Sequence, residues 1–313
     1  MAGRSDVDPL RRPTTRLIAL YRQPTPSRRN LLVVAVTFLV VVTTLMILAV
    51  GPAGLGATGV MLVAGLAIVL VVFALGTADR AVLALAGARP VSRADQPRYH
   101  NLVDGLCISA GLTKPSLHLV DDPALNAFSV AGPRRTSIAL TRGAVEQFSR
   151  IELEAVLAHE LFHVKRGDAF PSTLAVILLG WPGLAVDWGR RGLSRPRNPK
   201  AGASRPRGVM VLLAAPLVLL FPVALVFGQL VRLAVGRERE MRADQGGVRL
   251  TRYPPGLVSA LERIRARGGM VVSASRSTAH LWIVPPLQGP RNTGRLVASH
   301  PSTEVRIVAL KDL

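Results

Sequence analysis

The feature that most constrains the fold is a pair of long, uncharged apolar runs near the N-terminus. The first, Leu31 to Val50, has twenty residues without a charge, and as a helix it would span ~30 Å, the thickness of a hydrocarbon core. The second extends from Val60 to Ala78. Runs of this length are typical of helices in lipid rather than of a buried hairpin in a soluble protein. Residues 31–78 are therefore expected to form a transmembrane hairpin.

The flanking segments favour an anchor over a cleaved leader. Residues 1–30 contain seven Arg, two Asp and four Pro, a longer basic region than signal peptides have. Further along, Phe170–Trp188 is apolar but broken by prolines, Val209–Val235 is a cleaner apolar run, and seven basic residues lie between them. The chain is thus expected to divide into a basic cytoplasmic arm (1–30), a first hairpin (31–78), a soluble part (79–169), a second hairpin with a basic loop (170–235) and a second soluble part (236–313).

Composition narrows the possible partners. The chain has 39 Lys and Arg against 19 Asp and Glu, a net charge of +20, and 49% apolar residues with a mean hydropathy of +0.35. Aromatic residues make up only 4% and do not interleave with the arginines, so nucleic acid is not expected as a partner. Anionic lipid headgroups are expected instead. The single cysteine, Cys107, excludes an internal disulfide and a cysteine-based zinc site.

The first soluble part has the pattern of a small mixed domain. Leu117–Val120 and Thr136–Leu140 are expected to be short strands, joined through Asn126-Ala127-Phe128 and a turn at Gly132-Pro133. A helix is expected to begin near Thr141. A second helix is expected between Ser149 and Gly167, because Ser149 and Glu152 have the spacing of a capping box and Gly167 stands where a C-cap would fall.

That second helix contains His159-Glu160-Leu161-Phe162-His163, an H-E-x-x-H motif. Residues four apart lie on one helical face, so the two imidazoles can bind the same Zn²⁺. The glutamate between them can accept a proton from a water molecule activated by the metal. The motif alone is only moderately specific, since two histidines and a glutamate also occur on solvated helix faces.

A catalytic zinc site usually has a third protein ligand, and here an acid or a histidine on another helix could supply it. Glu240 and Asp244 lie one turn apart in a helical pattern from about Leu230 to Leu250. One carboxylate could bind the metal while the next orients a ligand imidazole. Glu238 is the rival ligand, but no acid follows it one turn later. The Gly246-Gly247 pair is expected to shorten this helix.

Four blocks in this order resemble the M48 family of membrane zinc metallopeptidases. The blocks are Asn126-Ala127-Phe128, the H-E-x-x-H motif extended to Asp168, Arg239-Glu240 through Asp244, and His300-Pro301 through Arg306-Ile307. The resemblance covers roughly residues 95–313. Within that family, the chain length and the four apolar stretches favour the HtpX-like branch over the larger, many-spanning Ste24-type CaaX prenyl proteases, which adds to what the resemblance shows. The resemblance implies an α+β fold: a multi-pass membrane protein whose mostly helical, gluzincin-type domain carries a small β-sheet.

The resemblance also implies roles for individual residues. It assigns His159, His163 and Glu240 to one Zn²⁺ per chain, Glu160 to general-base catalysis, His300 to the oxyanion, Asp244 and Asp168 to orienting the ligands, and Asn126 and Arg306 to the peptide. An extended substrate is expected to add to an edge strand at Thr136–Leu140 and to bind there through Ile138 and Ala139. The expected reaction is endopeptidase cleavage of unfolded or membrane proteins, in quality control or a stress response.

The metal ligands also bear on topology. His163 and Glu240 must meet at one metal, so the chain between them crosses the membrane an even number of times. The seven arginines before Leu31 favour a cytoplasmic N-terminus, and two crossings then return residue 79 to the cytoplasm. A multi-pass cell-membrane protein with a cytoplasmic catalytic domain is expected. Full crossing by residues 170–188 would place the basic loop outside, so a re-entrant segment there is the alternative.

Three rival functions remain at this point. An intramembrane metalloprotease is disfavoured because charged residues flank the H-E-x-x-H motif at Glu152, Glu154, Lys165 and Arg166. A CaaX-type prenyl protease would share the chemistry but not the chain length. A non-catalytic membrane adaptor would bind lipid without hydrolysing peptides, although every expected catalytic residue is present.

Overall fold

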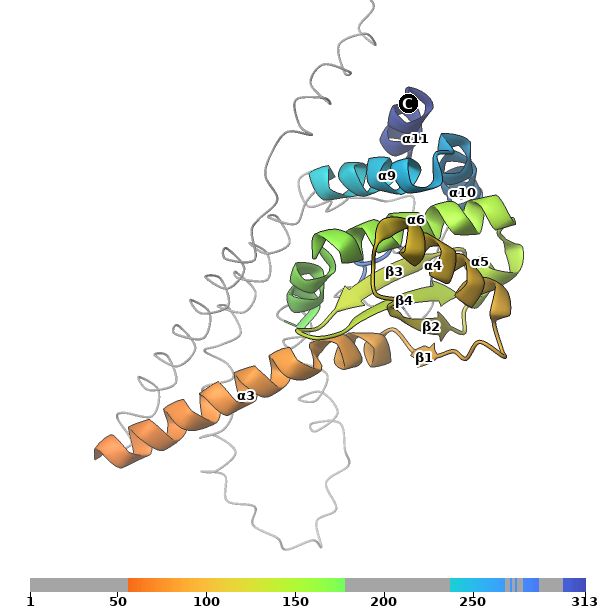
Figure 1. The fold of residues 1–313 in the computed structure, drawn as a ribbon. Helices are drawn as coiled ribbons and strands as arrows, with labels where there is room; N and C mark the ends of the chain where they lie inside the picture. Colours follow the sequence, from red (N-terminus) through yellow and green to blue (C-terminus); the bar gives the residue numbers. More distant parts are fainter. Residues whose placement is uncertain (1–55, 178–236, 268–270, 272–273, 275–277, 287–300) are drawn as a thin grey trace, which may run out of the picture.

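The computed structural model describes residues 56–177, 237–267, 271, 274, 278–286 and 301–313. Its labelled elements (Figure 1) are α3 (Gly56–Leu85), β1 (Ala88–Pro90), α4 (Pro97–Ala110), β2 (Ser116–Val120), β3 (Ala127–Ala131), β4 (Thr136–Thr141), α5 (Arg142–Gln147), α6 (Arg150–Arg166), α9 (Arg237–Thr251), α10 (Pro254–Ala266) and α11 (Thr303–Lys311). A further helical segment covers residues 169–177.

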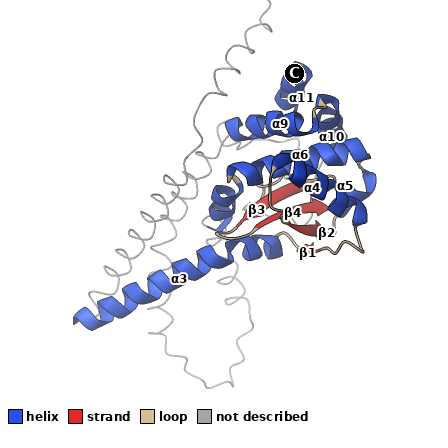
Figure 2. Cartoon of the chain, in the orientation of Figure 1, coloured by secondary structure: helices blue, strands red, loops and turns tan. Residues whose placement is uncertain are grey.

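Four strands form one mixed sheet in the order β1-β2-β4-β3. β2 and β4 are parallel, while β1 and β3 pair with their neighbours in the antiparallel sense. The sheet lies between α3 on one face and α6 on the other (Figure 2). The expected α+β class with a small sheet and mostly helices is therefore confirmed.

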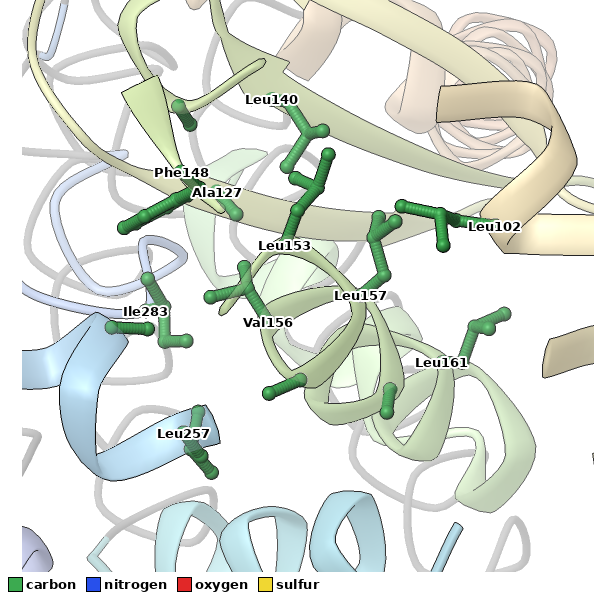
Figure 3. Close-up of a cluster of buried hydrophobic side chains, with 14 of the residues drawn as sticks. Leu102, Ala127, Leu140, Phe148, Leu153, Val156, Leu157, Leu161, Leu257 and Ile283 are labelled. Carbon is green, nitrogen blue, oxygen red and sulfur yellow. The ribbon is translucent and has the colours of Figure 1, made fainter. Parts of the chain in front are cut away.

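The main hydrophobic core lies between the sheet and α6. Figure 3 shows Leu153, Leu157 and Leu161 of α6 near Leu140 of the sheet and Leu102 of α4. A second cluster on the opposite face joins α3 to Phe128 and Trp282. Because α6 is packed by the sheet on one side and by α9 and α10 on the other, the side chains it carries are held in place by the core.

The two predicted strands form where the sequence placed them, but the second is not at the edge of the sheet. Strands form at Ser116–Val120 and Thr136–Thr141, and the turn at Gly132-Pro133 joins β3 to β4. However, β4 has paired neighbours on both sides, so it is not an edge strand. The edge strand next to β4 is β3, which begins in the segment expected to be a connection. All five β3 residues are buried, so they lack the alternation by which a strand is recognised in sequence.

The expected membrane segments are described only in part. The basic arm, the first apolar run and the basic loop lie outside the described residues, as does most of the second hairpin. The second apolar run, Val60 to Ala78, is helical within α3. Met61, Val69, Val72 and Phe73 on it are more than 60% exposed. Counting only the described residues, no helix is long and apolar enough to cross a membrane.

Helix α9, which contains Glu240 and Asp244, is not shortened by its two glycines, contrary to expectation. It continues through both to Thr251, because they lie where α9 crosses α6 at close range. A Cβ at Gly247 would lie 2.9 Å from the backbone nitrogen of His159, and one at Gly246 would lie 2.0 Å from the Phe162 ring. The glycine pair therefore permits two helices to approach closely.

We expect Gly247→Ala to destabilise the protein although alanine is the better helix former. The new methyl meets backbone rather than a movable side chain, and overpacking costs about 1–3 kcal/mol. Gly105→Ala, in α4 where a Cβ meets nothing within 4 Å, should instead stabilise by up to ~1 kcal/mol. Thermal unfolding of the full chain in detergent measures both, and equal stabilisation by the two changes would contradict the close packing.

Candidate metal centre

Helix α6 presents the H-E-x-x-H motif in a fixed register. It begins with a complete capping box, in which Ser149 Oγ accepts from Glu152 N and the Glu152 side chain accepts from Ser149 N, and Gly167 ends it at φ 76°. Both ends are as predicted. His159 and His163 lie one turn apart, and their Nε2 atoms are 3.2 Å from each other. The buried packing of α6 therefore aims two imidazole nitrogens at one point.

Helix α9 brings a carboxylate to the same point. Glu240 Oε2 lies 3.6 Å from His159 Nε2, and Glu240 Oε1 lies 3.6 Å from His163 Nε2. The three side chains are 0–4% exposed, and each offers a ligand atom within 4.8 Å of the other two. Two imidazoles and one carboxylate form a donor set that binds a divalent transition metal. The expected ligand triad is thus brought together.

Asp244 contacts the ring nitrogen of His159 that does not face Glu240. Its Oδ1 lies 2.9 Å from His159 Nδ1, which fits the orienting role expected for it. Burial opposes charge on both groups. The contacts of His159 with Asp244 and Glu240 outweigh its burial and raise its pKa to about 9. The guanidinium of Arg306 likewise outweighs burial at Asp244 and lowers its pKa. Asp244 is therefore a charged carboxylate within ion-pair distance of the imidazole.

Arg306 lies behind the ligand helix. Its Nε and Nη2 donate to the two oxygens of Asp244 at 2.8 and 2.6 Å, and its Nη1 donates to the Ile283 carbonyl at 2.5 Å. The residue is 1% exposed. These bonds make Arg306 a support for Asp244, 62 positions away in sequence. The contact with a peptide that the resemblance implied stays a prediction.

Glu160 lies beside the triad with its carboxylate almost free of partners. It is 1% exposed, and among the described residues its Oε2 has no hydrogen-bond partner. Burial raises its pKa and the charge of Glu240 adds to this, whereas the charge of His159 and a hydrogen bond with the Ser129 side chain oppose it. A raised pKa suits a group that must accept a proton and then give it up.

Arg239 is a support that the sequence patterning did not reveal. Its Nε and Nη2 donate to Glu240 Oε1 at 3.2 and 2.9 Å. Its Nη1 donates to the Asp168 carbonyl at 3.2 Å and to Ser172 Oγ. Arg239 thereby joins the metal ligand on α9 to the turn that follows α6. In sequence it stands in an alternating run of arginines and glutamates, a pattern typical of a solvated helix face.

Arg239→Gln is expected to weaken metal retention by ~10–100-fold, the usual effect of losing a group that orients a ligand. Arg239→Lys keeps the charge but cannot reach both Glu240 and the turn, so it should be intermediate. Arg249→Gln, at an exposed position of the same helix, is the matched control. Competition with a chelator measures the affinity. Equal affinities of Arg239→Gln and Arg249→Gln would contradict this role.

The other residues predicted for the site are not among the candidate metal ligands. Asp168 lies in the turn after α6 with its carboxylate 3.7 Å from Arg166 Nε, and burial raises the pKa of that carboxyl. Ile138 and Ala139 are fully buried in β4, so the expectation that they flank a free edge is wrong. Asn126 Nδ2 donates to the Val284 carbonyl at 2.8 Å. His300 lies outside the described residues.

In this α+β domain, two histidines of an H-E-x-x-H motif meet a glutamate from a second helix. That arrangement is the site of a metallopeptidase. Residues 93–313 match peptidase family M48, and the chain belongs to that family. It is 42% identical to the "Protease HtpX homolog" of Tropheryma whipplei strain Twist, over 75% of this chain and 78% of that protein. The homologue of Syntrophobacter fumaroxidans is 34% identical, over 88% of this chain and 98% of that protein.

A further "Protease HtpX homolog", from Dictyoglomus thermophilum, is 34% identical over 76% of this chain and 77% of that protein. The expected family is therefore confirmed, and the chain is a metalloprotease. Its residues His159, His163 and Glu240 form the candidate metal site.

Proposed function

We propose that this chain is a zinc-dependent endopeptidase of the membrane that cleaves unfolded or membrane proteins in quality control. The observation that carries the proposal is that Glu240 of α9 meets His159 and His163 of α6. Glu160 lies buried on the same turn of α6 as the two histidines. Two imidazole nitrogens and a carboxylate oxygen are a donor set of catalytic zinc sites, which keep a further position open. One ion per chain is expected.

The reaction follows from the positions of the chain's own groups. Zinc, when bound, supplies Lewis-acid polarisation of the scissile carbonyl and acidifies a water molecule. Glu160 accepts the proton from the attacking water and delivers it to the leaving amine. Asp244 and Arg306 keep His159 in one orientation, and Arg239 does the same for Glu240. His300 is proposed to donate to the oxyanion, as the family resemblance implies.

The membrane assignment rests on the sequence. Residues 31–78 are proposed to cross as a hairpin and place the catalytic domain in the cytoplasm, with the basic arm against anionic lipid headgroups. The exposed apolar side chains of α3 suit contact with lipid. Cysteines at Thr58 and Arg134 in a Cys107→Ser background test the orientation. In intact cells an impermeant thiol reagent should label only Thr58→Cys, and labelling of Arg134→Cys would overturn it.

Purified full-length protein tests the activity. We expect one zinc per chain, hydrolysis of casein, loss of hydrolysis on chelation and recovery with added zinc. Protein that holds stoichiometric zinc and cleaves neither casein nor a denatured membrane protein would instead support the non-catalytic adaptor.

A further inference from the structure

The β3 edge of the sheet is covered by a short segment of the chain's own C-terminal part. We call residues 280–284 the strap. Phe128 of β3 and Trp282 form an antiparallel bridge, and Ile283 N donates to the Ala127 carbonyl at 2.9 Å. The Asn126 side chain adds its bond to the Val284 carbonyl. The strap therefore lies along β3 as an added strand would.

The strap is also held at both ends by the groups that support the metal ligands. His280 Nε2 lies 3.1 Å from the carbonyl of Ser172, whose hydroxyl accepts from Arg239. The Ile283 carbonyl accepts from Arg306, which holds Asp244. Between these ends Trp282 is fully buried, with its ring 4.6 Å from that of Phe128. The strap thus extends from the support of Glu240 to the support of His159.

This arrangement leaves little room for a polypeptide substrate. The metal ligands and Glu160 are at most 4% exposed, whereas a scissile peptide bond must reach them. An extended substrate gains main-chain hydrogen bonds by adding to an edge strand, and β3 is the edge strand next to α6. The Ala127 carbonyl that such a substrate would use is already bonded to Ile283.

We propose that the strap is an autoinhibitory segment that occupies the substrate-binding edge of β3 and is displaced when an extended substrate binds. The inference rests on the proposed peptidase function. An intramolecular strand competes at a high effective concentration. The apparent affinity for substrate is therefore the intrinsic affinity multiplied by the fraction of molecules in which the edge is open. Long, unfolded, apolar polypeptides compete for the edge, and folded proteins with no free strand do not.

A reversible cross-link tests the proposal in the full-length, zinc-loaded protein. Phe128→Cys with Trp282→Cys, in a Cys107→Ser background, can form a disulfide that locks the strap to β3. Oxidation should lower casein hydrolysis at least ~10-fold without loss of zinc, and a reductant should restore it. A matched pair, Ala88→Cys with Val120→Cys, joins paired residues of β1 and β2, and its oxidation should leave hydrolysis unchanged.

Hydrolysis by the locked protein at the rate of its reduced form would overturn the proposal. If the double variant is inactive in both forms, Ile283→Pro decides, because proline lacks the N–H that bonds to Ala127. It should lower KM for casein several-fold with zinc content unchanged, and an unchanged or higher KM would also overturn the proposal. Failure of the wild-type protein to cleave casein would count against the peptidase function rather than the strap.

Discussion

Glu160→Gln is expected to keep the metal and the fold and to lower peptide hydrolysis by about 10²–10⁴-fold, the range for a general base. Glutamine has the shape of glutamate, so the packing of α6 should persist. It cannot accept the proton of an attacking water molecule, and at 1% exposure bulk solvent offers no substitute. Zinc stoichiometry, thermal unfolding and casein turnover, measured on one preparation, separate loss of the base from loss of the site.

Glu154→Gln is the matched control for that change. Glu154 lies on the same helix but lines a surface pocket with Ile151 and Tyr253, away from the metal ligands. Its replacement should leave turnover near that of the wild type. Wild-type turnover by Glu160→Gln would show that another group takes the proton.

Glu240→Ala should abolish stable metal retention, whereas Asp244→Asn should lower the affinity by only ~10–100-fold. The first change leaves two imidazoles, fewer than the three protein ligands of catalytic zinc sites. The second leaves all three ligands in place and removes the negative charge of Asp244, which both Arg306 and His159 contact. Equilibrium competition with a chelator gives the affinity, and casein hydrolysis gives the activity.

Glu262→Ala controls for the removal of a carboxylate. Glu262 lies on α10, outside the metal centre, and its carboxylate is 2.8 Å from Lys311 Nζ of α11. This variant should bind metal as the wild type does. Retention of metal by Glu240→Ala would make another residue the third ligand, and Glu238 is the rival that the sequence offers. Equal loss by Asp244→Asn and Glu240→Ala would contradict the separation of ligand from orienting group.

The parts predicted from the sequence are those with local signals. The caps of α6 depend on residues within one helical turn of its ends, so Ser149, Glu152 and Gly167 located both ends correctly. The spacing of His159 and His163 fixes their common face by helical geometry alone. Glu240 and Asp244 became candidates because the donor set was incomplete and they lie one helical turn apart, and the resemblance to the M48 family assigned the metal to Glu240. These inferences used short-range geometry, the chemistry of the metal and the order of the family's motifs.

The parts that the sequence did not reveal depend on contacts between distant segments. Whether β4 lies at the edge or inside depends on where β3 pairs, and the uniformly buried β3 has no alternating pattern. The Gly246-Gly247 pair looks like a helix breaker until α6 is found against it. Arg239 looks like surface charge and Arg306 was assigned to the peptide, and only the folded chain brings them to Glu240 and Asp244. A buried ion pair leaves no mark on local periodicity.

X-ray absorption at the zinc edge of the full-length protein tests the central claim most directly. We expect zinc bound by two imidazoles and a carboxylate oxygen, with nitrogen and oxygen neighbours at about 2.0–2.2 Å and an altered spectrum for Glu240→Ala. A sulfur neighbour near 2.3 Å, a third imidazole, or a spectrum that Glu240→Ala leaves unchanged would contradict a zinc centre formed by His159, His163 and Glu240.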